Sequence, residues 1–343
     1  MKKILVTGGA GYIGSHTVVE LYNHGYEAII MDNFSNSDPG VIKAIEEIVD
    51  SKINFINVDV SEEALFIEEF DKISHDISGV IHFAAFKSVP ESVKEPQKYY
   101  DNNIKSMTNV IFAAKSINVP IIFSSSCSVY GNADTPKVTE DTPLKQAQSP
   151  YADTKQMCEY ILKLACSTYK FKGISLRYFN PIGAHSSGLI GENPIKNIDN
   201  LIPRLCKMAL DRDEVTVFGL DYPTHDGSCI RDYIYIMDLA NAHVKALEHA
   251  FDMPHVYDVF NVGTGMGTSV LELLKTFELA TDVPLIIRKC DRREGDVVEI
   301  YSDTTKINNV LGWESKYDLL FSLESAWNWA LKLYRHKVKN DIY

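Results

Sequence analysis

The stretch Thr7-Gly8-Gly9-Ala10-Gly11-Tyr12-Ile13-Gly14 decides the fold of this chain. It follows a short apolar run, Lys3 to Thr7, that predicts a strand, and it opens a helical pattern at about 13 to 24. Its glycines allow a tight turn, a close approach of the backbone to a pyrophosphate and close packing of the helix. Ordinary turns and helix caps use glycine too. The position between strand and helix, where helix-terminal amides face an anion, favours a dinucleotide-binding turn.

Outward from this turn, short apolar runs alternate with amphipathic stretches. Further strands are expected at Ala28 to Asp32, Ile53 to Val58, Val80 to Phe83, Ile121 to Ser124 and Ile174 to Leu176, and helices at about 39 to 50, 62 to 71, 96 to 117 and 150 to 170. Strands separated by helices are joined by right-handed crossovers, which make a parallel sheet covered on both faces. The first half therefore predicts an α/β, doubly wound fold.

After about residue 180 the rhythm changes. The stretch from Pro181 to Pro203 is rich in Gly, Pro and Asn and is typical of irregular chain that faces a ligand. Beyond it, helices are expected at about 203 to 211, 237 to 250, 269 to 281 and 320 to 337, with short strands at Val215 to Phe218 and Val259 to Val262. We expect a smaller, mixed α/β C-terminal domain over residues 181–343, with chain crossovers back to a first domain of residues 1–180.

Composition narrows the class of protein. The 343 residues are 45% hydrophobic and 23% charged, close to globular averages, and contain no apolar run long enough for a membrane span. A net charge of -12 disfavours nonspecific binding to nucleic acid. The six cysteines show no CxxC pair, which indicates reduced thiols rather than a disulfide or zinc framework. We therefore expect a cytoplasmic protein without a membrane partner or a structural metal.

Acidic residues after the second and third strands extend the predicted nucleotide site. Asp32 ends the second strand, 18 residues after Gly14. Its carboxylate can accept hydrogen bonds from both ribose hydroxyls and would repel a 2′-phosphate, which favours NAD over NADP. A helix cap or turn aspartate is the alternative interpretation. Asp59 and Val60 follow the third strand and can bracket the adenine, although a turn aspartate explains Asp59 almost equally well.

A tyrosine and a lysine one helical turn apart supply a candidate base. Tyr151 and Lys155 lie on one face of the helix expected from residue 150. An ammonium near a phenol favours the phenolate and brings its pKa, ordinarily about 10, toward neutrality. Ser126, just beyond the fifth strand, can reach the same place and orient a substrate hydroxyl. A Tyr and a Lys at this spacing are usually just an exposed pair on a helix. Here they follow a glycine turn and a strand that ends in serines, which favours a catalytic role.

With these motifs the chain resembles the extended short-chain dehydrogenase/reductase family, and within it the nucleotide-sugar epimerases, over essentially its whole length. The stretches that carry the resemblance are TGGAGYIGSHT, MDNFSNS, IHFAAFKSVPESV, YYDNN, FSSSCSVYG, SPYADTK, LRYFNPIGAH, DGSCIRDYIYIMDLA and RREGD. The resemblance implies a Rossmann sheet with bound NAD in the first domain. It also implies epimerisation of UDP-glucose and UDP-galactose at C4 through a 4-keto intermediate.

The resemblance also implies roles for individual residues. The cofactor positions are Gly8, Gly11, Tyr12, Ile13, Gly14, Asp32, Asn33, Asp59, Val60, Phe83, Ala84, Ala85, Lys87, Asn102, Tyr151, Lys155 and Phe179, and Ser126, Tyr151 and Lys155 form the catalytic set. The positions that hold the UDP-sugar are Lys87, Ser126, Tyr151, Asn180, Asn200, Leu201, Phe218, Arg231, Arg293, Asp296 and Ile300. Two structural alternatives stay open. Arg231 can form an ion pair with Asp232, and Phe218 can be a core residue.

Ile300 is the expected gate for the sugar. In the resembled family a Tyr at this position accompanies enzymes restricted to UDP-glucose and UDP-galactose, and a Cys or Ser accompanies those that also take N-acetylhexosamines. Isoleucine leaves more room than Tyr, but its β-branched side chain is stiff and larger than Cys. We therefore expect slower but measurable turnover of UDP-N-acetylglucosamine. The alternative is that Ile300 is a core residue and Tyr301 lines the pocket.

Two other functions compete with epimerisation, and a second copy of the chain is the expected protein partner. Nucleotide-sugar 4,6-dehydratases and uronate decarboxylases resemble the first half, but they carry acidic residues where this chain has Cys127 and Ser128. A non-catalytic NAD-sensing protein would be expected to lose the catalytic trio, which is present. The resemblance implies a homodimer formed through helices at about 96 to 117 and 150 to 170.

Overall fold

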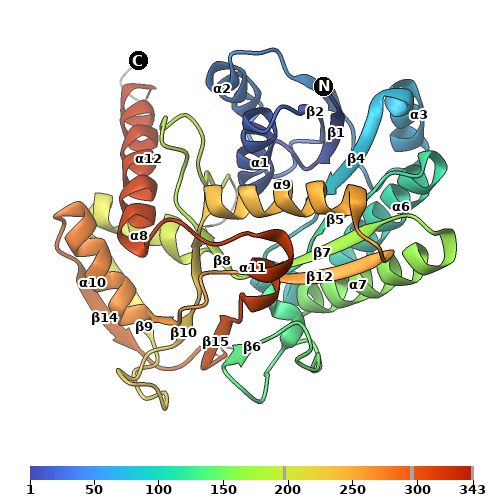
Figure 1. Ribbon diagram of the computed structural model, residues 1–343. Coiled ribbons are helices and arrows are strands. Elements are labelled where there is room, and N and C mark those ends of the chain that lie inside the picture. Colours follow the sequence, from blue (N-terminus) through green and yellow to red (C-terminus); the bar gives the residue numbers. More distant parts are fainter. Residues whose placement is uncertain (196–197, 294–296, 341–343) are drawn as a thin grey trace.

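A parallel sheet of seven strands forms the centre of the larger part of the molecule (Figure 1). The computed structural model describes residues 1–195, 198–293 and 297–340. Within them the strands lie in the order β12-β7-β5-β4-β1-β2-β3, and each neighbouring pair is parallel. Their bounds are β1 Lys3–Thr7, β2 Glu27–Asp32, β3 Asn54–Asn57, β4 Ile77–His82, β5 Ile121–Ser124, β7 Gly173–Tyr178 and β12 Tyr257–Val262. The predicted doubly wound Rossmann sheet is confirmed.

Helices cover both faces of this sheet. One layer consists of α1 (Tyr12–Asn23), α2 (Gly40–Val49) and α9 (Ile236–Asp252), and the other of α3 (Glu63–Ile73), α6 (Lys105–Ile117) and α7 (Pro150–Tyr169). Alternate strand residues supply the two cores: Ile4 and Val6 pack in the first, and Leu5 packs in the second. Because both faces of β1 are buried, its sequence is continuously apolar rather than alternating. The strand order reverses at β1, which opens a crevice at the carboxyl ends of β1 and β4.

The chain crosses between its two parts. Helix α9 packs on α1, and β12 extends the large sheet beside β7, although both elements follow residue 181 in the sequence. In the opposite direction, β6 (Lys137–Val138) leaves the first part and pairs with β15 (Glu299–Ser302). The division into domains at residue 180 stays a prediction.

The second part has its own apolar core. Helices α8 (Leu201–Asp211), α10 (Val270–Thr281) and α12 (Leu319–Asn340) pack together beside β9 (Glu214–Phe218), which pairs with β14 (Ile286–Cys290). A four-stranded sheet in the order β13-β10-β15-β6 contains β13 (Thr268–Ser269) and β10 (Ile230–Arg231), and β8 (Asn180–Ile182) pairs with β11 (Tyr233–Tyr235). Short helix α11 (Thr305–Leu311) packs near β12.

One expected helix is wrong in detail. Instead of a single helix over 96 to 117, the structure has α5 (Pro96–Tyr99), a π-helical turn (Tyr100–Ile104) and α6, preceded by a short helix, α4 (Val89–Lys94). The side chain of Asn103 accounts for the turn, because it bonds the main chain of Phe86 in both directions and also bonds Thr154. Such turns are frequent at functional sites. No helix in the described ranges is both long and apolar enough to cross a membrane.

Candidate active site

A cavity of about 690 Å³ opens at the carboxyl ends of β1, β2 and β4. Its wall begins at the glycine turn, continues along the loop after β2 and the loop after β4, and reaches α7. The opposite wall comes from residues 189–194 and from α12. The volume lies within the range of small-molecule and cofactor sites.

The glycine turn lies close to its neighbouring strands. Gly8 has a φ of 70°, and a Cβ there would lie 2.7 Å from the amide nitrogen of Ala84. Only glycine meets both conditions without strain. Gly11 is the N-cap of α1, and the first turn of that helix carries no acidic side chain. The helix terminus therefore offers amides and a partial positive charge to a phosphate in the cavity.

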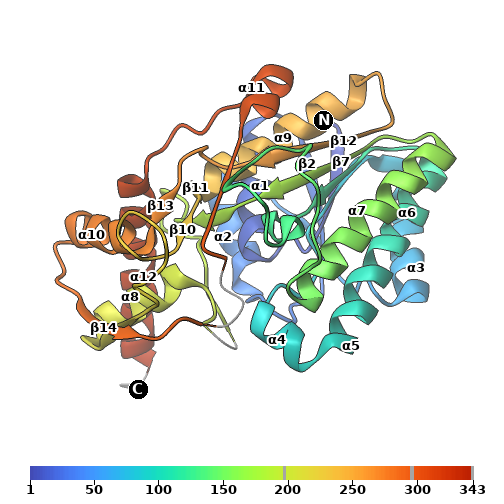
Figure 2. The ribbon, with the colours of Figure 1, turned by 90° about the horizontal axis from the view of Figure 1, so that it is seen from below.

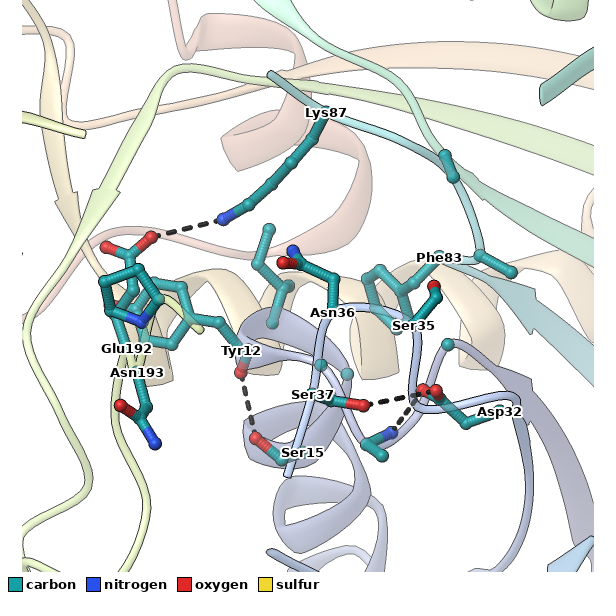
Figure 3. Close-up of a pocket in the computed structure, with 18 of the residues that line it drawn as sticks. Tyr12, Ser15, Asp32, Ser35, Asn36, Ser37, Phe83, Lys87, Glu192 and Asn193 are labelled. Carbon is teal, nitrogen blue, oxygen red and sulfur yellow. Dashed lines mark hydrogen bonds and ion pairs between the residues drawn. The ribbon is translucent and has the colours of Figure 1, made fainter. Parts of the chain in front are cut away.

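Asp32 holds the turn and lines the cavity at once. Its carboxylate is 8% exposed and accepts hydrogen bonds from Ala10 N at 3.0 Å, Phe34 N at 2.8 Å and Ser37 Oγ at 3.2 Å (Figure 3). Burial raises the pKa of Asp32, and these bonds partly offset the effect. The N-cap of α2 is Pro39, so Asp32 is not its cap. The bonds to Phe34 and Ser37 make it a turn aspartate as well as a cavity residue.

Asp59 also combines two contacts. It accepts hydrogen bonds from Ser61 N and Ser61 Oγ, which is a turn interaction, and a third from Asn33 Nδ2 at 2.7 Å. Asp59, Val60 and Asn33 all line the cavity. The loops after β2 and β3 are thus tied together where an adenine would lie.

The start of α7 brings the candidate base to the cavity. Ser149 caps the helix by accepting a hydrogen bond from Ala152 N, and Pro150 occupies the first turn. Tyr151 and Lys155 are only 8% and 4% exposed, so they are not the exposed helical pair that the spacing alone allows. The Lys155 ammonium donates to the main-chain oxygen of Ser124 at 2.6 Å, at the end of β5.

The electrostatics of this pair differ from the expectation. Burial raises the pKa of the Tyr151 phenol well above its ordinary value, and a hydrogen bond with Ser126 lowers it only in part. Burial also lowers the pKa of Lys155 to about 8. A positive charge close to a phenol favours the phenolate, and α7 brings the Lys155 ammonium to this end of the cavity.

Residues predicted for the sugar gather at the junction of the two parts. The guanidinium carbon of Arg293 lies 5.7 Å from the centre of the Phe218 ring, and Phe218 is half-buried rather than a core residue. Arg231 donates to the main-chain oxygen of Ile230. Asp232 instead accepts bonds from Thr264, Gly265 and Ser302, which makes it a loop clamp.

Ile300 is 5% exposed and lies in a small apolar cluster beside the serine strand, which is β5 with the serines that end and follow it. It pairs with Arg231 across β15 and β10. The rest of the cluster consists of Val129, Tyr130, Val138 and Phe179, with Cys127, Ala133 and Val297 packed against it. Burial raises the pKa of the Cys127 thiol to about 12. Ile300 is therefore a core residue at this end of the site and, through Cys127, a close neighbour of Ser126.

The cavity brings together most of the predicted cofactor residues. Its wall contains Gly8, Gly11, Tyr12, Ile13, Gly14, Asp32, Asn33, Asp59, Val60, Phe83, Ala84, Ala85, Lys87, Asn102, Tyr151 and Lys155, together with Asn200 from the sugar set. Predicted residues outside this wall are Ser126, Phe179, Asn180, Leu201, Phe218, Arg231, Arg293 and Ile300. Asp296 lies outside the described residues. Among those described, no cluster of metal-binding side chains is found.

The sequence did not predict Glu192, which joins the two walls of the cavity. Its carboxylate accepts hydrogen bonds from Lys87 Nζ at 3.1 Å and from Asn200 Nδ2 at 2.5 Å (Figure 3). Trp329 on α12 donates to its main-chain oxygen at 2.9 Å. The sequence signal was its place in the Gly, Pro and Asn-rich stretch that was expected to face a ligand.

Comparison with known proteins places the chain in a family. The profile described as the NAD dependent epimerase/dehydratase family matches residues 4–263. The chain belongs to this family. The match spans the glycine turn, the serine strand and the buried Tyr151 and Lys155.

Its relatives and structural neighbours are similar over almost their whole length. A UDP-glucose 4-epimerase of Bacillus subtilis is 44% identical over 95% of this chain and 96% of its own length. A Stenotrophomonas maltophila UDP-glucose-4-epimerase, solved with NAD and formylated UDP-arabinopyranose, superposes with a TM-score of 0.93 at 40% identity, covering 98% of this chain and 100% of its own. The Bifidobacterium longum enzyme, solved with NAD⁺ and UDP, gives 0.91 at 41% identity, covering 96% and 98%.

Proposed function

We propose that this chain is a UDP-glucose 4-epimerase that interconverts UDP-glucose and UDP-galactose with bound NAD. The observation that carries the proposal is that Tyr151, buried and one helical turn from Lys155, lines a cavity whose wall begins at a dinucleotide-type glycine turn. The family and the names of its relatives agree with this chemistry.

The residues present fit NAD. Asp32 offers a carboxylate to ribose hydroxyls, the N-terminus of α1 faces the place for a pyrophosphate, and Phe83 to Ala85 line the space beyond β4. NAD⁺ held by these residues would supply a hydride acceptor for C4 of the sugar and a positive charge near the Tyr151 phenol.

The chain itself moves one proton and holds the sugar. Tyr151, as phenolate, takes the proton from the 4-hydroxyl and later returns it to O4 of the product. Ser126 orients that hydroxyl through its hydrogen bond to Tyr151, and the Lys155 ammonium adds positive potential. Phe218, Arg231 and Arg293 are proposed to hold uridine and pyrophosphate, and Asn180, Asn200 and Leu201 to line the space around them. The cofactor is regenerated in each cycle, so no external redox partner is required.

A homodimer is part of the proposal. Large apolar side chains are exposed along α6 and α7, which lie side by side on the outer face (Figure 2). They are Phe112 at 54%, Met157 at 40%, Tyr160 at 69%, Leu164 at 55% and Tyr169 at 51% exposed. An apolar surface of this kind on paired helices suits a second copy of the chain.

The six free cysteines support a reducing compartment, and we infer a cytoplasmic location.

The proposal is tested by incubating the purified protein with UDP-glucose, UDP-galactose and their N-acetylated forms, and separating the products by chromatography. Interconversion of the first two without added reductant is expected. A product that has lost water would indicate a 4,6-dehydratase instead, and unchanged substrates would indicate a non-catalytic protein.

A further inference from the structure

A buried ion pair lies directly behind the serine strand. Glu159 follows Lys155 by one turn of α7 and is 5% exposed, and Arg177 on β7 is 6% exposed. Arg177 Nε donates to Glu159 Oε1 at 2.9 Å, and Arg177 Nη2 donates to Oε2 at 2.7 Å. This two-pronged geometry fixes both side chains relative to each other more strictly than a single contact would.

Each member of the pair holds one end of the segment that carries Ser126. Ser125 Oγ donates to Glu159 Oε1 at 2.5 Å. At the other end, Arg177 Nη1 donates to the Tyr130 hydroxyl at 3.2 Å, and that hydroxyl donates to Asn261 Oδ1 at 2.6 Å. Residues 125–130, the serine segment, are therefore clamped at both ends by one ion pair.

Stability alone does not explain this arrangement. A buried ion pair is often no more stabilising than apolar residues of the same size, because both charges lose their water. Its distinctive property is a defined geometry, since each lone pair and proton needs a particular partner. Ser126 lies between the two clamped residues, next to the Tyr151 hydroxyl. The clamp therefore sets where the Ser126 hydroxyl stands relative to the base.

We propose that Glu159 and Arg177 are positioning residues for epimerisation, which hold Ser126 in register with Tyr151 and the sugar 4-hydroxyl. This inference rests on the proposed function. It predicts that loosening the clamp lowers turnover without weakening substrate binding, because the groups proposed to hold uridine and pyrophosphate lie on other elements.

The first variant is Ser125→Ala, which removes one link and leaves the ion pair intact. A displacement of a reacting group by about 1 Å can cost about a hundred-fold in rate, so we expect kcat to fall about ten- to a hundred-fold. The KM for UDP-glucose and the bound NAD should not change. The matched control is Ser322→Ala on α12, which removes a 2.8 Å hydrogen bond from a buried Ser322 Oγ to the main-chain oxygen of Asp318, remote from the serine segment. This control should lower Tm by a similar amount and leave kcat unchanged.

A double-mutant cycle with Ser126→Ala separates positioning from general destabilisation. If Ser125 acts through Ser126, adding Ser125→Ala to Ser126→Ala lowers kcat no further. Multiplicative losses, or a Ser125→Ala variant with reduced Tm but normal kcat, would overturn the inference. Full activity of Ser126→Ala alone would instead overturn the catalytic assignment in the proposed function. Glu159→Gln, which breaks the ion pair, should lower kcat at least as far as Ser125→Ala.

Discussion

The ammonium nitrogen of Lys155 lies 5.8 Å from the centre of the Tyr151 ring, and burial penalises the charged form of both side chains. A positive charge close to the phenol favours the phenolate, because a buried site screens charges poorly.

Replacing Tyr151 by Phe removes the proposed base and keeps the ring. General base catalysis contributes about a hundred- to ten-thousand-fold, so kcat should fall by a factor in this range. Binding of NAD and UDP, measured by calorimetry and by cofactor content, should be retained. Near-normal epimerisation by this variant would refute the assignment of Tyr151.

Replacing Asp32 by Ser tests the choice of cofactor. Loss of a charge-assisted hydrogen bond costs about 1.5–3 kcal/mol, so NAD retention should weaken about ten- to a hundred-fold and discrimination against NADP should shrink. Asp71→Ser is the control, since Asp71 is exposed on α3 and does not line the cavity. The interpretation is wrong if the wild-type protein is purified with NADP or prefers it in titration.

Stability should fall in mild acid because of buried histidines. Burial lowers the pKa of His16 and His82 to about 3 and that of His243 to about 4. Below about pH 6.5 these histidines take up protons in the unfolded chain but not in the folded chain. The free energy of unfolding is therefore highest above pH 6.5 and falls as the pH is lowered. Each histidine should cost about 1 kcal/mol between pH 7 and 5.5.

Urea unfolding at pH 7 and 5.5 measures this loss. In His243→Gln, the difference in unfolding free energy between the two pH values should shrink by about 1 kcal/mol. An equal pH dependence in wild type and His243→Gln would contradict the prediction.

The choice of sugar is predicted to depend on Ile300. Ile300 is buried in an apolar cluster that contains Val129 and Tyr130 of the serine segment, so a change in the size of its side chain alters the packing there. The comparison is kcat/KM for UDP-glucose and UDP-N-acetylglucosamine in wild type, Ile300→Tyr and Ile300→Ser. Ile300→Tyr should make the enzyme more selective for UDP-glucose, and Ile300→Ser should improve turnover of UDP-N-acetylglucosamine. The change in discrimination between the two sugars should be about 1 to 3 kcal/mol. Unchanged ratios in both variants would show that Ile300 is not the gate.

The proposed dimer is tested on α7. Tyr160 and Leu164 lie on one stripe of the helix, and their joint replacement by Glu should give a monomer in sedimentation. Leu279 on α10 is 70% exposed, and Leu279→Glu should leave the assembly unchanged. A wild-type monomer, or a variant that dimerises as before, would rule out this surface.

Local patterns predicted the elements of this fold well. Strands β1 and β5 have the expected bounds, and the glycine turn lies where its neighbours in sequence require it. The place of β12 at the edge of the large sheet was not predicted, because strand order depends on contacts between distant segments. Glu192 was not predicted as a site residue for the same reason, because its hydrogen bond to Lys87 joins positions 105 residues apart in the sequence.

The site was predicted by residue type more than by geometry. Burial of Tyr151 and Lys155, and the π-helical turn at Tyr100–Ile104, follow from tertiary packing that no local pattern contains. No local pattern predicted the ion pair between Glu159 and Arg177. Each member has an ordinary place in its own helix or strand, and their contact appears only when α7 lies on β7.

The most direct test of the account follows the hydrogen at C4. UDP-glucose deuterated at C4 is incubated with the purified protein, without added cofactor or reductant, and the UDP-galactose formed is analysed by mass spectrometry and NMR. Because the proposed hydride leaves and returns within one site, we expect UDP-galactose that retains deuterium at C4. Loss of the label to solvent, or no UDP-galactose from protein shown to contain NAD, would contradict it.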